Sequence, residues 1–208
     1  ERPQIKKEFA AFANVRVLLA MGITVFGPAA FFTSITYIAP MMVEIAKFDP
    51  ASVTWLMVVF GLGLFLGNIL GGRYADKALM PLLYLTLGAQ AIVLLIFSQT
   101  AHSQIMSVAC ILLMAGFGFA TVSPIQKLVM DKARAAGAPT LASAVNIGLF
   151  NLGNAIGAWV GGFVISAGLG YAAPNWAGAL LSVIALLLAL ASVAMDRRDG
   201  ASSVLQTA

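Results

Sequence analysis

Six long apolar runs separated by short charged segments constrain this chain more than any other feature. They cover residues 17–41, 52–72, 80–97, 105–124, 140–167 and 176–195. A helix needs about 20 apolar residues to cross a hydrocarbon core of roughly 30 Å, so each run is long enough to span a membrane. The alternation of a membrane β-strand is missing from these runs. The sequence therefore predicts an all-α membrane protein with six transmembrane helices.

Composition supports a lipid environment. Hydrophobic residues make up 61% of the 208 residues and charged residues only 10%, too few to cover a water-soluble globule of this size. The basic residues are spread over separate short segments rather than gathered on one face, which argues against a nucleic-acid partner. Cys110 stands alone inside an apolar run, where a small core residue is the ordinary interpretation.

The basic residues also predict an orientation. Apart from Lys47, every Lys and Arg lies in alternate segments, namely before the first run, after the second, after the fourth and after the sixth. Because Lys and Arg near helix ends are retained in the cytoplasm, both termini should be cytoplasmic. Residues 1–15 are expected to form an amphipathic cytoplasmic lead-in, residues 16–198 the bundle, and residues 199–208 a disordered cytoplasmic tail.

A weak internal duplication relates the two halves of the chain. The segment from Tyr37 to Pro40 resembles that from Thr121 to Pro124, and Gly67, Gly71 and Gly72 match Gly157, Gly161 and Gly162 in spacing. The related helices would run in opposite directions, so the pattern predicts two inverted three-helix repeats. Chance similarity is the alternative, because Gly and Pro are common in membrane helices.

The loop after the second run contains Gly72, Arg73, Asp76 and Lys77. A plain solvated turn would explain these charges equally well. Its Gly-x-x-x-Asp-Lys pattern resembles the signature loop of the major facilitator superfamily. With segments 32–40, 67–72, 138–147 and 150–157, the chain is similar to the C-terminal six helices of the drug:proton antiporter and sugar-efflux (arabinose-efflux permease-like) branch. Tyr74 in place of a small aliphatic residue, and the lack of a trailing Gly and basic pair in 78–81, depart from that signature.

The resemblance implies efflux of a small neutral or amphiphilic solute, sugar-like or drug-like, by alternating access in a bacterial inner membrane, with protons as the exchanged ion. Family members have twelve helices, so this half would need a missing N-terminal six-helix half or a second copy of itself. A non-transporting scaffold is a third possibility. No enzyme activity, cofactor or metal site is expected, because the sequence lacks a catalytic or metal-ligand cluster.

The resemblance also assigns the first and fourth helices to a central cavity. Polar groups in lipid should face protein or water, which selects Thr33, Tyr37, Asn68, Gln90, Thr121, Asn146, Asn151 and Asn154 as inward-pointing. The candidate cavity residues are Phe26, Thr33, Tyr37, Phe117, Thr121, Asn146, Phe150 and Asn154. Ordinary packing between helices is the alternative for each of them. No Asp, Glu, Lys, Arg or His lies deep in any of the apolar runs, so the proton-coupling group would lie in the other half.

Two glycine ridges complete the candidate residues. The second run has Gly63, Gly67 and Gly71, and the fifth has Gly153, Gly157 and Gly161. Glycines spaced by four residues let another helix approach closely. They predict a helix-packing interface, either inside this bundle or, as the family resemblance suggests for part of each ridge, against a second half.

Overall fold

The computed structural model describes residues 5–138 and 140–206 and has six helices long and apolar enough to span a membrane, which confirms the all-α membrane fold. The elements are α1 (Ile5–Ala11), α2 (Val15–Ile35), α3 (Ile38–Glu44), α4 (Ser52–Ala75), α5 (Leu79–Thr100), α6 (Gln104–Ala120), α7 (Val122–Ala135), α8 (Leu141–Val164), η1 (Ile165–Leu169) and α9 (Ala173–Gln206). The first span comprises α2 and α3, the fourth α6 and α7, and the fifth α8 and the π-helical turn η1.

Prolines explain the two interrupted spans. Pro40 and Pro124 lack the N–H that would bond to the carbonyl four residues earlier, and the proline ring crowds that carbonyl. The breaks fall at these places, between Ile35 and Ile38 and at Thr121. The segments that the sequence pairs as a repeat are therefore both proline-induced breaks, and the fourth span continues beyond Pro124 to Ala135.

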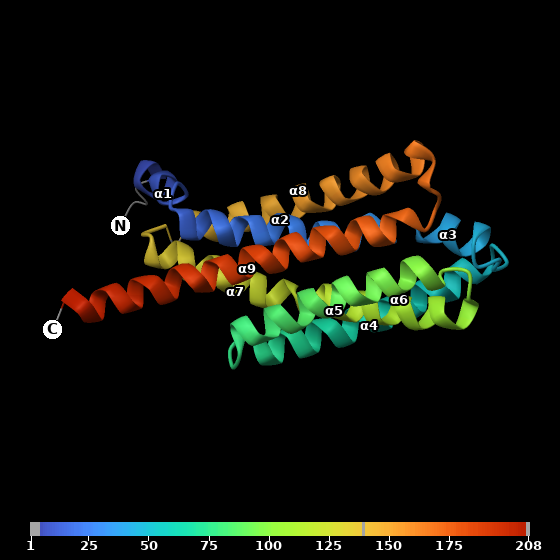
Figure 1. Cartoon of the computed structure of the whole chain (residues 1–208), viewed down its shortest axis with the longest axis horizontal. Coiled ribbons are helices and arrows are strands. Elements are labelled where there is room, and N and C mark those ends of the chain that lie inside the picture. Colours follow the sequence, from blue (N-terminus) through green and yellow to red (C-terminus); the bar gives the residue numbers. More distant parts are fainter. Residues whose placement is uncertain (1–4, 139, 207–208) are drawn as a thin grey trace.

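The helices pack in two interlocked groups. The first span, through α2, packs mainly on α8 and α9, whereas the fourth, through α6, packs mainly on α4 and α5. Helices α5 and α9 contact each other and join the groups (Figure 1). The contacts of the first span with the fifth and sixth thus correspond to the contacts of the fourth span with the second and third.

Close backbone contacts repeat the same exchange at single residues. A Cβ placed on Gly63, Gly67 or Gly71 would lie 2.2–2.6 Å from the carbonyl oxygen of Leu112, Gly116 or Ala120 of α6. On α8, the same atom on Gly153, Gly157 or Gly161 would lie 2.3–2.6 Å from the carbonyl oxygen of Val25, Ala29 or Thr33 of α2. Each glycine ridge thus receives one turn after another of a neighbouring helix backbone within this bundle.

Helix α1 and the C-terminal part of α9 lie at the same end of the bundle (Figure 1). We call it the basic end, because Arg16 and Lys132 lie there beside the end of α9. There Lys132 Nζ lies 2.5 Å from Asp196 Oδ2, and Arg16 forms ion pairs with Asp196 and Asp199. These pairs hold the end of α9, which stays helical to Gln206. Of the predicted tail 199–208, residues 199–206 belong to α9 and residues 207–208 lie outside the described part.

The lead-in differs from a free surface helix. Of residues 1–15, the first four lie outside the described residues, and α1 occupies Ile5–Ala11. Glu8 is buried, and its carboxylate accepts a hydrogen bond from the Leu141 backbone N–H at 2.9 Å. That N–H lies at the start of α8, where the helix dipole favours a negative charge. The lead-in is thereby attached to the beginning of the fifth span.

Candidate functional site

Two clusters of side chains connect the first, second, fourth and fifth spans on the side that α5 and α9 do not cover. We call the surface that carries them the open face, made by one side of α2, α4, α6–α7 and α8. The first is an amide cluster. Asn146 of α8 accepts a hydrogen bond from the Thr24 hydroxyl at 2.7 Å and donates another to the Gln126 side chain of α7. Gln126 in turn lies 3.4 Å from the Ser143 hydroxyl.

A small cavity adjoins the amide cluster. It has a volume of about 170 Å³ and is lined by Val122, Gln126, Asn146, Ile147 and Phe150. An aromatic ring, an aliphatic wall and amide groups together suit an uncharged organic group better than an ion, because an ion there would lack a compensating charge. Asn146 and Phe150, both predicted from the sequence, are thus brought together.

Asn154 extends this surface along α8. It lies four residues after Phe150, so both fall on one side of the helix. Its side-chain oxygen is buried, and among the described residues it has no hydrogen-bond partner. A buried acceptor without a donor is costly, so this oxygen is a natural place for a hydroxyl or N–H group of a ligand or for water.

The second cluster is aromatic. Phe31 of α2 packs against Phe32 (ring centroids 5.3 Å apart), against Phe60 of α4 (5.5 Å) and against Phe119 of α6 (5.2 Å). Phe31 itself is buried against Gly118, while the three surrounding rings are half-buried. Those three rings come from α2, α4 and α6 and give the open face an apolar aromatic region.

Three of the predicted cavity residues lie in packing instead. Thr33 and Thr121 are buried, and their hydroxyls donate to the carbonyls of Ala29 and Gly118 on their own helices. Phe26 packs against both main hydrophobic clusters of the bundle. In this bundle all three contact neighbouring residues of the chain, and their place along a cavity completed by a second body stays a prediction.

Tyr37 and Phe117 also lie elsewhere. The Tyr37 hydroxyl donates to the Ala158 carbonyl of α8 at 2.7 Å, and its ring covers Gly161. Phe117 lines an apolar groove between α4 and α5 rather than the open face. The spans are apolar all round, so helical spacing by itself does not reveal which stripe faces a neighbour.

The remaining predicted residues divide between packing and surface. Gln90 is buried and donates to the Gly27 carbonyl at 3.2 Å. Asn68 and Asn151, in contrast, are exposed on the bundle. The six ridge glycines are buried against α6 and α2: Gly63, Gly67, Gly71, Gly153, Gly157 and Gly161. Within this bundle the ridges therefore serve packing between helices, and a contact of part of either ridge with a second half stays a prediction.

The signature loop lies at the basic end. Gly72, Arg73, Asp76 and Lys77 are all exposed. Asp76 Oδ1 lies 3.2 Å from Nζ of Lys127 on α7, which Asp131 also approaches at 3.9 Å. The loop of the second span is thus linked to the fourth span by an exposed ion pair. Among the described residues no group of three His, Cys, Asp or Glu is placed to hold a metal ion.

Sequence reasoning missed Gln126, Thr24 and the aromatic cluster. Gln126 falls outside the fourth apolar run, which ends at Pro124, whereas the helix resumes as α7. The available signal was the amphipathic pattern of 122–135, in which Ile125, Leu128 and Val129 recur at helical spacing among polar and charged residues. Phe119 lies two residues from Phe117 and therefore on a different side of α6.

Comparison with known proteins decides the family. A model of the Major Facilitator Superfamily matches residues 20–206. The chain belongs to the major facilitator superfamily. It is 41% identical over 191 residues to the inner membrane transport protein YdhP of Escherichia coli K12, covering 92% of this chain and 49% of that protein.

Two further relatives have names that state a function. The chloramphenicol resistance protein of Streptomyces lividans is 30% identical over 192 residues, covering 90% of this chain and 47% of that protein. A probable sugar efflux transporter of Helicobacter acinonychis is 30% identical over 161 residues, covering 74% and 39%. The chain thus spans about half the length of these curated relatives, or less.

Proposed function

We propose that this chain is one half of a twelve-helix exporter of the bacterial inner membrane, which moves a small neutral or amphiphilic solute by alternating access. Its open face would supply one wall of the central cavity, and a second six-helix body would supply the other. The basic end would face the cytoplasm, because Lys and Arg near helix ends are retained there.

The exposed amides carry the proposal of a second body. Asn68 of α4 and Asn151 of α8 lie well inside their membrane-spanning helices, and both are exposed on this bundle. An amide directed at lipid tails is costly, so these side chains need protein or water beside them. The lengths of the relatives agree, since this chain matches only about half of YdhP.

The exchange of neighbours supports two inverted repeats within the half. The contacts of Gly67 with Gly116 and of Gly157 with Ala29 have equivalent places in the two groups. Secondary transporters built from such repeats place the solute at the repeat interface and rock rigid bodies around it. Tight backbone packing inside each group fits a half that moves as one body.

An uncharged substrate fits the chemistry of the open face. Its amide cluster, the free acceptor of Asn154 and the phenyl rings offer hydrogen bonds and apolar area without a formal charge. Chloramphenicol and sugars, which appear in the names of two relatives, are both neutral hydroxyl-bearing molecules. Proton exchange would use a titratable group of the second half.

The experiment measures export from cells that express the transporter with both halves. Accumulation of radiolabelled chloramphenicol, and separately of a neutral monosaccharide, is compared between the unaltered protein and variants. Phe150→Ala should reduce export of the transported solute about two- to tenfold, since an aromatic contact contributes roughly 0.5–1.5 kcal/mol. Phe163→Ala, on the same helix and 59% exposed, is the matched control and should leave export unchanged.

Equal export by Phe150→Ala and Phe163→Ala, at equal amounts of protein in the membrane, would contradict the cavity assignment. A homodimer of this half is tested separately with Asn151→Cys in a Cys110→Ala background. If the second body is a distinct six-helix half, this cysteine should form no cross-link to a second copy of the same chain.

A further inference from the structure

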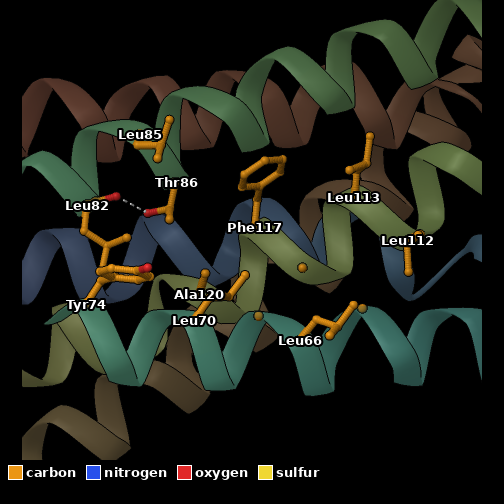
Figure 2. A pocket seen from close by; sticks show the side chains of 13 residues that line it. Leu66, Leu70, Tyr74, Leu82, Leu85, Thr86, Leu112, Leu113, Phe117 and Ala120 are labelled. Atoms are coloured by element: carbon orange, nitrogen blue, oxygen red, sulfur yellow. Dashed lines mark hydrogen bonds between the residues drawn. The ribbon is translucent and has the colours of Figure 1, made fainter.

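An apolar groove opens on the side of the bundle between α4 and α5. It has a volume of about 350 Å³, and its floor is the backbone of α6 at Gly116. Figure 2 shows Leu66, Leu70 and Tyr74 rising from α4, Leu82 and Leu85 from α5, and Phe117 from the floor between them. The groove exists because α4 and α5 make few contacts with each other and because the glycines in its lining, Gly63, Gly67 and Gly116, place no side chain in it.

The lining of the groove is almost entirely apolar. Its one hydroxyl on α5, that of Thr86, donates to the Leu82 carbonyl at 2.9 Å and lies 3.3 Å from that of Leu83, so it has an acceptor within its own helix. Leu66, Leu85 and Leu113 on the rim are each more than two-fifths exposed. Between the corresponding helices α8 and α9, in contrast, Val160, Val164, Ala173 and Ala177 pack together in a hydrophobic cluster.

The length of the groove matches one leaflet of a bilayer. On α4 the lining residues run from Gly63 to Tyr74, which at about 1.5 Å per residue is about 16 Å. Half of a hydrocarbon core of roughly 30 Å is about 15 Å. Tyr74 lies at the basic end of α4, so the groove extends from that membrane surface to about the middle of the bilayer.

The charges at the mouth of the groove are positive. Arg73 lies seven residues after Leu66, on the same side of α4. Lys77 lies in the loop just beyond the end of this helix. Asp76, between them in sequence, is drawn to Lys127 of α7. Within the described residues neither Arg73 nor Lys77 has an acidic partner. Two cations near a membrane surface attract the phosphate of a lipid headgroup.

We propose that this groove holds one phospholipid of the leaflet at the basic end, with an acyl chain along α6 and its phosphate beside Arg73 and Lys77. The lipid would fill the gap that α4 and α5 leave and would support α4, whose opposite side borders the open face. This is a site of its own, outside the solute path, so it stands or falls independently of which solute is exported.

The test uses the transporter reconstituted in phosphatidylethanolamine vesicles that contain increasing amounts of phosphatidylglycerol with a photoactivatable group at the end of one acyl chain. Cross-linked residues are identified by mass spectrometry. The proposal expects labelling of Leu112, Leu113 and Phe117 that saturates at a low fraction of the probe. Leu85→Trp, which fills the groove, should abolish it, whereas Ile92→Trp, two turns along the same side of α5, should not.

The mouth is tested with charge variants. Arg73→Gln and Lys77→Gln should each raise the probe fraction needed for half-saturation about fivefold, the equivalent of about 1 kcal/mol per cation near a membrane surface. Lys47→Gln, at the opposite end, should leave it unchanged. Labelling that rises without saturation over all outward-facing helices would mean ordinary surrounding lipid and would overturn the proposal. Absence of groove labelling, because a helix of the second half covers these residues, would overturn it equally.

Discussion

Replacing Gly157 by Ala should destabilise the bundle although it adds only one methyl group. A Cβ at this position would lie 2.3 Å from the Ala29 carbonyl oxygen, whereas ordinary contacts begin at 3.4 Å. The obstacle is backbone, which cannot turn aside like a side chain, so α8 and α2 must separate by about 1 Å. Inserting atoms into a tightly packed core costs typically about 1–3 kcal/mol.

Gly148→Ala on the same helix is the matched control, because nothing lies within 4 Å of its Cβ. Both substitutions gain the same helix preference of Ala over Gly, about 1 kcal/mol. The difference between the two free energies of unfolding therefore isolates the steric term. It is measured by equilibrium unfolding in mixed micelles of mild detergent and sodium dodecyl sulfate, followed by circular dichroism.

The second half of this prediction concerns the repeat. Gly67 faces the Gly116 carbonyl with a Cβ distance of 2.2 Å, so Gly67→Ala should cost about as much as Gly157→Ala. Free energies of unfolding for Gly157→Ala and Gly148→Ala that agree within experimental error would refute the close approach of α2 and α8. A cost at one glycine only would refute the equivalence of the two groups.

Three further substitutions follow from single contacts. Asn146→Leu leaves Thr24 and Gln126 without their shared partner and should lower the free energy of unfolding by about 1–3 kcal/mol, while the exposed Asn151→Leu should change it little by the same measurement. Lys127→Gln breaks an exposed ion pair and should cost at most about 1 kcal/mol, decreasing with salt, in unfolding titrations at two ionic strengths. Pro124→Ala supplies the missing N–H, so hydrogen exchange at the amides around the break between α6 and α7 should become slower.

The sequence was sufficient for the fold because lipid imposes strict lengths and complete backbone hydrogen bonding on every span. Charge, run length and the glycine spacing therefore predicted the number of helices and the positions of close packing. The breaks within the first and fourth spans were harder to predict, because a proline at the end of an apolar run ordinarily indicates the end of a helix. At Pro124 that indication is wrong, since α7 continues from Val122 directly after the break.

The sequence predicted site residues only where a polar side chain shows which side of a helix must face protein. Asn146 lies on the open face because its amide needs Thr24 and Gln126, and such a requirement is visible in the residue type. Phe26 and Phe117 gave no such signal. In an apolar span a phenyl ring can face lipid, a groove or the core, and only the neighbouring helices decide among them.

Contact of the exposed amides Asn68 and Asn151 with a second body across a water-filled cavity, rather than with lipid, underlies the proposed function. It is tested most directly by the rate at which a membrane-impermeant maleimide modifies single cysteines in a Cys110→Ala background, in inner-membrane vesicles holding the whole transporter. We expect Asn68→Cys and Asn151→Cys to react with the maleimide, and their rates of modification to change when solute is added, whereas Ile92→Cys on α5 should stay unmodified. Equal rates of modification at all three positions, with and without solute, would contradict the proposed cavity.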